Sequence, residues 1–391
     1  MSSLNRRSIL RWLLLVAVLV FTITVAHRKG NDINVYLHAA DQLWNSVDPY
    51  ISNPYNQYLY GPFFALLLKP LTLLGYPIAR VVWALLCMAA LYRSWDIFRK
   101  EVLVPAAFSE KLISRMGLVL LLLSVNVYIH NLNLGQVTLP MLWCIIEGMY
   151  QIRKSRPWLG SAILAFGINL KILPLLVLFY YFLNRRWKPI ILTMGILVLL
   201  LLIPALFIGW EANLAFHGHW LQMINPVGKK FGVEINDGCV SINCLMSRLP
   251  LSLDAMKWST LVLRLIVVAV MTIYFFRRRN MARTSVQYWK DISMLFLVIL
   301  LVFPHQMKYS MLFILPTGAY LLYRFYQQGS RWKGIYYLSA FCLVVPAIMG
   351  RDIIGNSATD FLDTIGILGI INALLFALLI SEKEKAPSEV R

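Results

Sequence analysis

Charged residues are scarce in this chain, and acidic residues are the scarcer kind. Only 14% of the 391 residues are charged, and 18 residues are acidic, whereas a soluble globular domain carries about 25% charged residues. Hydrophobic residues make up 59% of the chain. Segments such as 13–25 and 194–208 are almost continuously apolar, and runs of roughly 20 such residues fit the hydrocarbon core of a bilayer. The composition excludes an ordinary soluble domain and predicts a polytopic membrane protein.

The apolar runs also lack the polar–apolar alternation of β-barrel strands. Only α-helices and closed barrels cross a bilayer, because every backbone N–H and C=O must find a partner within the protein. Barrel strands are shorter than these runs and alternate between lipid-facing and lumen-facing residues. The sequence therefore predicts an all-α polytopic membrane protein, with residues 1–391 forming a single membrane domain.

Basic residues far outnumber acidic ones, and the formal net charge is +19. No basic surface helix or stacking motif accompanies this charge, so we expect no nucleic-acid partner. The basic residues instead lie in short clusters between apolar runs, which is typical of the cytoplasmic loops of membrane proteins. The clusters are Arg6/Arg7/Arg11, Arg99/Lys100, Lys111/Arg115, Arg153/Lys154/Arg156, Arg185/Arg186/Lys188, Arg277/Arg278/Arg279/Arg283 and Arg331/Lys333.

These clusters predict a topology. No small-residue cleavage site follows the first apolar run, which we interpret as an uncleaved first span. The alternation of clusters then indicates about twelve membrane helices, with both termini in the cytoplasm and a cytoplasmic tail over residues 381–391. Segment 157–183 fits this alternation only if it enters and leaves on the cytoplasmic side. Because residues 167–174 interrupt it, we expect a broken helical hairpin, and broken helices at membrane depth often line a site.

Two long outer loops are expected, over residues 27–75 and 209–258. The first should contain interfacial helices, because an amphipathic stretch begins at Asp32. Asp32 and Tyr36 share one face of that stretch at the i, i+4 spacing. Two interpretations of Asp32 stay open. The carboxylate could act as a general base on an acceptor hydroxyl, or it could be a helix N-cap or a solvated side chain.

Five motifs follow one another along the chain in an order that carries more information than any of them singly. They are Asp32 with Ala39-Ala40, Asp48-Pro49-Tyr50 and the segment from Tyr58 to Leu71; Gly135-Gln136-Val137; Arg153 to Pro157 with Gly160, Lys171, Pro174 and Arg185-Arg186-Trp187; Ser241-Ile242-Asn243 with Leu245 and Arg248; and Phe303-Pro304 with Tyr309 and Leu315-Pro316. In order and spacing they resemble glycosyltransferase family 87. That family belongs to the glycosyltransferase C superfamily and includes polyprenyl-phosphate-mannose-dependent mannosyltransferases.

The chain departs from the family pattern at two places. Gly61 stands where the family has the first proline of a Tyr-Pro-Pro sequence. The fifth motif usually reads Pro-x-Ser-Trp-x-His, and here Pro304 is followed by His305-Gln306-Met307-Lys308-Tyr309. The polar group of that motif has therefore either moved to His305 or been replaced by Tyr309.

The resemblance implies a glycosyltransferase C-like fold with a membrane-embedded cavity that opens outward. It implies inverting transfer of a hexose, with mannose favoured, from a polyprenyl-phosphate sugar donor to a glycolipid or glycan acceptor. Asp32 would deprotonate the acceptor. The setting implied is the cell envelope, with a multi-pass protein in a bacterial cytoplasmic (inner) membrane and an active site facing outward. Besides the two substrates, the expected partners are membrane lipids.

A donor phosphate at the outer interface needs cations, and charged residues within membrane depth are by default functional candidates. The cationic candidates are Lys171, Arg248, Lys308 and Arg264, in that order. Snorkelling is the alternative for Arg264, and loop solvation is the alternative for Arg248 and Lys308. The expected substrate contacts are Tyr36, Tyr60, Gln136, His305 and Tyr309. We expect no cofactor.

Several alternatives remain at the level of sequence. A lipid or anion transporter with a broken-helix site around Lys171 would also use buried cations, and a polymer ligase with a diphosphate-linked donor would keep the enzyme class. Cys239 and Cys244 could form a disulfide in an oxidising outer compartment, or Cys239 could be a simple substitution for the family's asparagine. His217 and His219 lack further ligands at metal-binding spacing, so we expect no metal.

Overall fold

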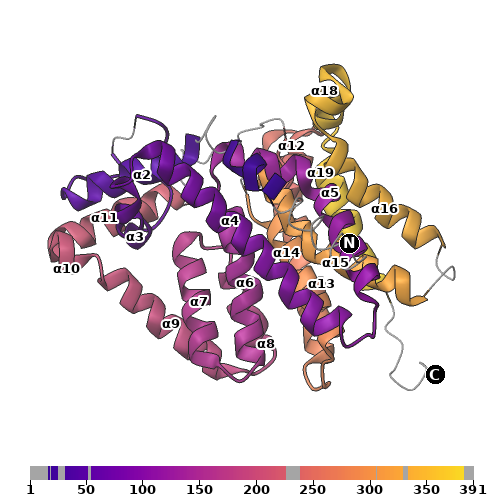
Figure 1. Cartoon of the computed structure of the whole chain (residues 1–391). Helices are drawn as coiled ribbons and strands as arrows, with labels where there is room; N and C mark the ends of the chain where they lie inside the picture. The colour runs from indigo at the N-terminus through magenta and orange to yellow at the C-terminus, as the bar shows by residue number, and fades with distance from the viewer. Residues whose placement is uncertain are drawn as a thin grey trace, which may run out of the picture. The chain divides into compact units, whose positions relative to one another are not determined.

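The computed structural model describes residues 16–17, 19–24, 31–51, 54–225, 238–304, 306–328 and 333–382. All regular secondary structure in these residues is helical, in eighteen α-helices with one π-helical and one 3-10 segment (Figure 1). Within them, the strand-like pairing is limited to an isolated bridge between Cys239 and Met307. The predicted all-α class is confirmed.

Contacts between residues divide the chain into two compact units. The first unit is Met1–Ser94, Ile129–Ile172 and Leu192–Lys230, and the second is Trp95–Tyr128, Leu173–Ile191 and Phe231–Arg391. Helices of the first unit are α2 (Asn31–Trp44), α3 (Pro62–Thr72), α6 (Thr138–Arg153), α7 (Pro157–Leu170), α10 (Ala205–Ile208) and α11 (Trp210–Ile224). Helices α4 (Tyr76–Phe98), α5 (Glu110–Leu134) and α9 (Trp187–Leu202) have residues in both units.

The second unit contains the remaining elements. They are η1 (Arg99–Leu103), α8 (Leu175–Leu183), α12 (Ile242–Ser247), α13 (Leu253–Arg278), α14 (Ser285–Val302), η3 (Lys308–Ile314), α15 (Leu315–Gln328), α16 (Lys333–Ile348), α17 (Arg351–Ile354), α18 (Asn356–Thr364) and α19 (Ile367–Ser381). Helix α14 packs against α13, α15 and α19, so it forms the centre of this unit.

The helices make this chain a multi-pass membrane protein. Five helices in the described ranges are long and apolar enough to cross a bilayer, or six if the bent pair α18 and α19 forms one span. They lie over Tyr76–Leu103, Glu110–Leu134, Trp187–Ile208, Leu253–Arg278 and Ser285–Val302. The described residues therefore contain fewer candidate spans than the twelve or so membrane helices expected from the sequence. Helices such as α7 and α16 are apolar but short, and about 20 residues at 1.5 Å each are needed to span the hydrocarbon core. The expected first span lies mostly outside the described residues.

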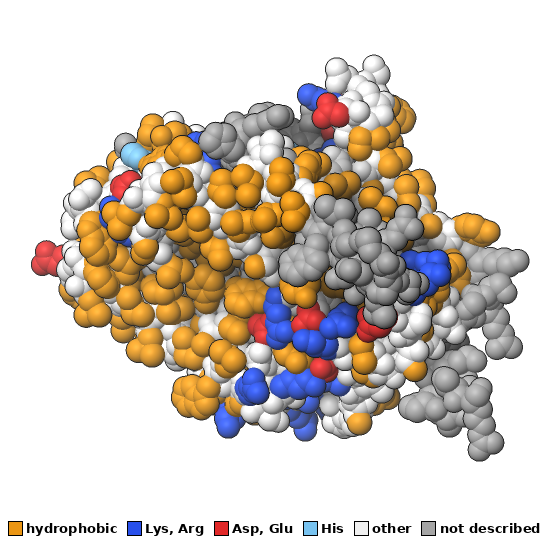
Figure 2. Space-filling view, viewed as in Figure 1, with side chains coloured by type: hydrophobic (Ala, Val, Ile, Leu, Met, Phe, Trp, Pro, Cys, Tyr) orange, Lys and Arg blue, Asp and Glu red, His pale blue; other side chains and the backbone are white. Residues whose placement is uncertain are grey.

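The exposed surfaces of the spans are suited to lipid rather than to water. In the most apolar stretch of the α9 span, only 11% of the residues are buried. In the α14 span, 78% are buried. Ile191, Val198 and Leu199 of α9 are all more than half exposed. Hydrophobic side chains cover much of the visible face of the molecule (Figure 2). Contiguous apolar patches of this kind are rare on soluble monomers, and α9 therefore faces the hydrocarbon.

Close helix packing organises the first unit around α6 and α7. A Cβ added at Gly160 would lie 2.5 Å from the backbone oxygen of Gly148, and one added at Gly148 would lie 2.6 Å from the Cγ of Leu164. Small residues allow such an approach between membrane helices, where packing replaces the hydrophobic effect as the driving force. The two glycines therefore hold α6 and α7 at contact distance.

Ion pairs stabilise the second unit at the start of α14. Lys290 and Asp291 are both fully buried. The Arg283 Nε lies 3.0 Å from the Asp291 carboxylate, and the Lys290 Nζ lies 3.6 Å from the carboxylate of Glu382. Buried charges are tolerated only when paired, so these contacts fix the beginning of α14 and the end of α19.

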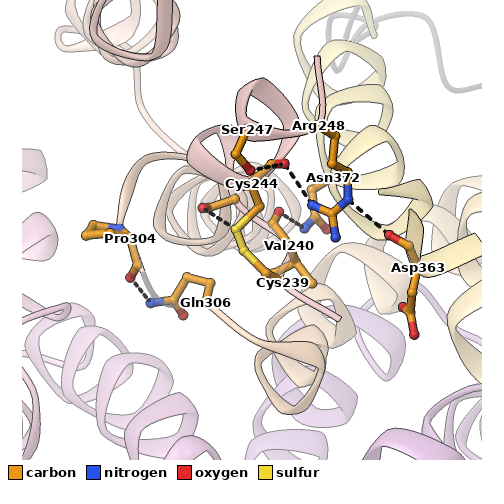
Figure 3. Close-up of a disulfide and its surroundings, with 10 residues drawn as sticks. Cys239, Val240, Cys244, Ser247, Arg248, Pro304, Gln306, Asp363 and Asn372 are labelled. Atoms are coloured by element: carbon orange, nitrogen blue, oxygen red, sulfur yellow. Dashed lines mark hydrogen bonds between the residues drawn. A yellow bond between two sulfur atoms is a disulfide. The ribbon is translucent and has the colours of Figure 1, made fainter. Parts of the chain in front are cut away.

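A disulfide joins Cys239 to Cys244 in the second unit, with 5.9 Å between their Cα atoms (Figure 3). The bridge resolves the alternative left open by the sequence. Cys239 precedes α12 and Cys244 lies within it. The Asn372 amide donates to the Val240 carbonyl at 3.2 Å, and the Val240 N–H donates to the Gln306 carbonyl at 2.8 Å. The bridged turn is therefore tied to α19 and to the segment before η3.

The disulfide predicts a specific count of reactive thiols. Maleimide labelling of the denatured chain should modify three cysteines, which are Cys87, Cys144 and Cys342, and all five after reduction. A Cys239→Ser/Cys244→Ser variant should give the same count with and without reduction. It should lose about 2 kcal/mol of stability, as a short closed loop implies. Labelling of all five cysteines without reduction would contradict the bridge.

The packing of α6 on α7 predicts a difference between two glycines. Gly160→Ala should lower stability by about 1–3 kcal/mol, because the added methyl group overlaps the α6 backbone. Gly195→Ala in α9 is the matched control, since nothing lies within 4 Å of its added Cβ, and it should leave stability unchanged or slightly raised. Thermal unfolding of the purified variants in detergent measures both, and equal melting temperatures would contradict the close packing.

Candidate active site

Asp32 lies in the first turn of α2, where a negative charge interacts favourably with the helix dipole. Its carboxylate accepts a hydrogen bond from the side-chain amide of Gln136. Gly135 makes this contact attainable. Its φ of +74° favours glycine, and an added Cβ would lie 2.8 Å from the side chain of Ile33. The close approach of the turn after α5 to the start of α2 thus brings Gln136 to Asp32.

Burial changes the acidity of this carboxylate. Loss of solvent raises the pKa of Asp32 from 3.8 to about 6, and the positive charge of Lys171 opposes part of that rise. A pKa near 6 suits a group that exchanges protons near neutral pH. Asp32 is therefore partly buried and hydrogen-bonded, and these properties separate it from a fully solvated N-cap.

Lys171 stands in the break between α7 and α8. It is the first residue beyond α7, with an extended backbone at φ −157° and ψ 138°, and Pro174 precedes α8. Proline cannot continue a preceding helix without loss of a hydrogen bond. The break therefore places a lysine where its charge acts on Asp32.

Tyrosines of α2 and of the segment between α2 and α3 lie near the start of α3. The hydroxyl groups of Tyr36 and Tyr60 lie 2.9 Å apart, and their ring centroids lie 4.8 Å apart. Tyr50 donates to the Tyr60 carbonyl at 2.6 Å, and Tyr58 donates to the Gly61 carbonyl at 3.1 Å. These bonds connect the non-helical chain before α3 to α2, which also carries Asp32.

Further polar contacts position α2. Lys69 forms an ion pair with Asp41 at 2.7 Å, so its charge has a partner on α2. The Nε of Arg80 donates to the Asn34 side chain at 3.0 Å. These bonds connect α2 to α3 and α4, which fixes the helix that carries Asp32.

Helix α11 contacts the segment between α2 and α3. The Nδ1 of His219 is hydrogen-bonded to the Asp48 carboxylate, and Trp220 donates to the Leu59 carbonyl at 3.3 Å. The Nδ1 of His217 lies 2.8 Å from the Asn213 carbonyl, and burial lowers the pKa of that ring. Each histidine thus has a protein partner. No cluster of three or more His, Cys, Asp or Glu that could hold a metal occurs in the described ranges.

The other cationic candidates lie in the second unit. Arg248 donates to the backbone carbonyls of Cys244 and Asp363 at 2.7 and 3.0 Å (Figure 3). Lys308 donates to the Met349 carbonyl, and burial lowers its pKa. Arg264 differs, since its Nε and one Nη are buried without a hydrogen-bond partner among the described residues.

The sequence-predicted residues therefore fall into two groups. Asp32, Gln136, Lys171, Tyr36 and Tyr60 belong to the first unit. The remaining candidates, Arg248, Arg264, Lys308 and Tyr309, belong to the second. His305 lies outside the described residues.

One side chain of the first unit was overlooked at the level of sequence. Asn169, in the last turn of α7, is 1% exposed. Neither its amide oxygen nor its amide nitrogen has a partner in the described structure. In the sequence it stood out only as part of a helix break. Burial without partners is a property of the folded chain, and no sequence pattern reports it.

Comparison with known proteins connects this geometry to a family. No curated protein matches the chain at significant similarity. The family model described as Glycosyltransferase family 87 matches residues 58–304, which is more than half of the chain. The match includes Gln136 and Lys171 and begins after Asp32. The chain therefore belongs to glycosyltransferase family 87.

Proposed function

We propose that this membrane glycosyltransferase moves a hexose, with mannose favoured, from a polyprenyl-phosphate donor to a glycolipid or glycan acceptor. The transfer inverts the anomeric centre, and Asp32 is the general base. The observation that carries the proposal is the partly buried Asp32 carboxylate, which accepts a hydrogen bond from Gln136 and lies within the electrostatic reach of Lys171.

The chemistry needs a base at the acceptor. Asp32 removes the proton of an acceptor hydroxyl while that oxygen attacks the anomeric carbon, and the bond from that carbon to the phosphate oxygen breaks. A single displacement of this kind inverts the configuration. The Gln136 amide orients the carboxylate so that its second oxygen faces the acceptor. General-base catalysis contributes about 10²–10⁴-fold when the base is positioned in this way.

The leaving polyprenyl phosphate carries negative charge that cations stabilise. Lys171 supplies a compact positive charge in the first unit, as a lysine does for phosphate groups. Arg264 is the second choice on structural grounds, because two of its nitrogens are buried without partners. Arg248 and Lys308 donate to backbone carbonyls of the second unit, and we keep them as proposed ligands of the donor phosphate. Tyr36, Tyr60, Gln136, His305 and Tyr309 are proposed substrate contacts.

We place this reaction at the outer face of a bacterial cytoplasmic membrane, with both termini in the cytoplasm. The basic clusters support this orientation. Residues 1–391 would form one glycosyltransferase C-like membrane domain. Membership of the family favours transfer over the transporter interpretation.

Removal of the Asp32 negative charge tests its role as the base. Asp32→Asn should lower the rate of transfer by about 10²–10⁴-fold, because the amide cannot accept the acceptor proton. The assay uses the purified chain in nanodiscs with polyprenyl-phosphate mannose and extracted membrane glycolipids. Asp41→Asn is the matched control on the same helix, where the carboxylate pairs with Lys69, and it should keep most of the activity. Equal activity of the wild type and Asp32→Asn would dismiss Asp32 as the base.

The acidity of Asp32 predicts a pH profile. Since its pKa is raised to about 6 and the base must be deprotonated, kcat/KM should rise with pH below about 6 and level off above it. Lys171→Gln removes a charge that lowers this pKa, so the inflection should move to higher pH. Lys69→Gln, whose charge is paired with Asp41, should leave the inflection in place. An unchanged inflection in Lys171→Gln would show that Lys171 does not act on the base.

A further inference from the structure

The Asn169 side chain shares its burial without hydrogen-bond partners with Asn131 of α5, and it differs from Asn131 in lying two residues before Lys171. It is 1% exposed, and both its Oδ1 and its Nδ2 lack hydrogen-bond partners in the described residues. A buried polar group without a partner lowers the stability of the folded chain, and such groups in native proteins call for a specific explanation. An ordered water or a substrate group that both donates and accepts would remove this cost.

The backbone of the outer segment leaves space for this amide. A Cβ at Gly61 would lie 3.2 Å from the Asn169 Oδ1 and 3.3 Å from its Nδ2. Gly61 has φ −64° and ψ 152°, values that any residue adopts, proline included. Glycine is therefore needed here for space and not for backbone freedom. A proline, which the family pattern has at this position, would fill that space.

Asn169 also lies near the groups proposed to act on the substrates. Lys171 follows it by two residues, so their Cα atoms lie within about 7 Å of each other. Lys171 in turn acts electrostatically on Asp32. A sugar joined to a phosphate beside Lys171 would therefore present its hydroxyl groups within reach of Asn169.

On the basis of the proposed function, we infer that Asn169 binds a hydroxyl group of the donor sugar. Gly61 leaves the room that the Asn169 amide itself occupies. A phosphate oxygen only accepts hydrogen bonds and would satisfy Nδ2 alone. A sugar presents hydroxyl groups that donate and accept, so it satisfies both amide atoms. Asn169 is thus a specificity-determining residue for the donor.

Access to the amide requires a movement of the chain that covers it. Gly61 belongs to the non-helical stretch between α2 and α3, and the Tyr58 hydroxyl holds its carbonyl at 3.1 Å. Displacement of this short stretch exposes Asn169 without unfolding a helix. The donor sugar then takes the place of any water bound to the amide.

The test compares donors that lack one hydroxyl each. The purified full chain in nanodiscs is given polyprenyl-phosphate mannose or each of its monodeoxy analogues, and transfer and thermal stabilisation by the donor are both measured. The wild type should lose roughly 10- to 100-fold in kcat/KM with one analogue, as the loss of a buried hydrogen bond implies. Asn169→Ala should lose a similar factor with the parent donor and should no longer distinguish that analogue from it.

Two variants control for structure. Gly61→Ala retains the backbone conformation and crowds Asn169, so it should reproduce the pattern of Asn169→Ala. Asn213→Ala removes a buried amide of α11 that donates to the Leu201 carbonyl, and it should lower stability without changing the discrimination between donors. A loss in Asn169→Ala that is equal for all donors would overturn the inference and make Asn169 structural.

The remaining outcomes separate the inference from the proposed function. Discrimination that appears only with deoxygenated acceptors would overturn the assignment to the donor. If the wild type binds polyprenyl-phosphate mannose and transfers nothing, the proposed reaction fails, and the stabilisation data alone decide the role of Asn169. If the wild type neither binds nor transfers it, both are overturned.

Discussion

The hydrogen bond between Gln136 and Asp32 connects residues 104 positions apart in the chain, and the first unit is arranged around it. A carboxylate that leaves water needs a partner, and Gln136 is brought to it by the close contact of Gly135 with Ile33. Trp83 donates to the Gly135 carbonyl at 3.0 Å, so α4 holds the same turn. Three helices therefore meet at the base, and its position does not depend on a flexible loop.

Much of the helical fold could be predicted from the sequence, because apolar runs of this length have few alternatives in a bilayer. The break after α7 was also visible, since Pro174 stops a helix by sterics that act locally. The number of spans was less predictable. Basic clusters mark the ends of apolar segments, and they do not report whether a helix such as α7 or α16 is long enough to cross the hydrocarbon.

The candidate site was predictable only in part, and the reason is physical. Asp32 stood out through its spacing from Tyr36 and through the family resemblance. Its partner Gln136 came from a separate motif, and the contact between them depends on tertiary packing. The role of the cations as phosphate ligands stays a prediction. Arg248 and Lys308 donate to backbone carbonyls, and a sequence does not show which acceptors a folded chain presents to a cation.

Two glycines of the first unit show that a sequence does not report why a position needs glycine. Gly135 has a positive φ and a close neighbour, so both the backbone and the packing need it. Gly61 has an ordinary backbone conformation, and only the neighbouring Asn169 explains its lack of a side chain. Partial burial of the Asp32 carboxylate and burial of the Asn169 amide without partners both reduce stability, and both groups occur in the first unit with Lys171. Such costs are maintained where they serve function rather than folding, which is why this region is where we expect chemistry.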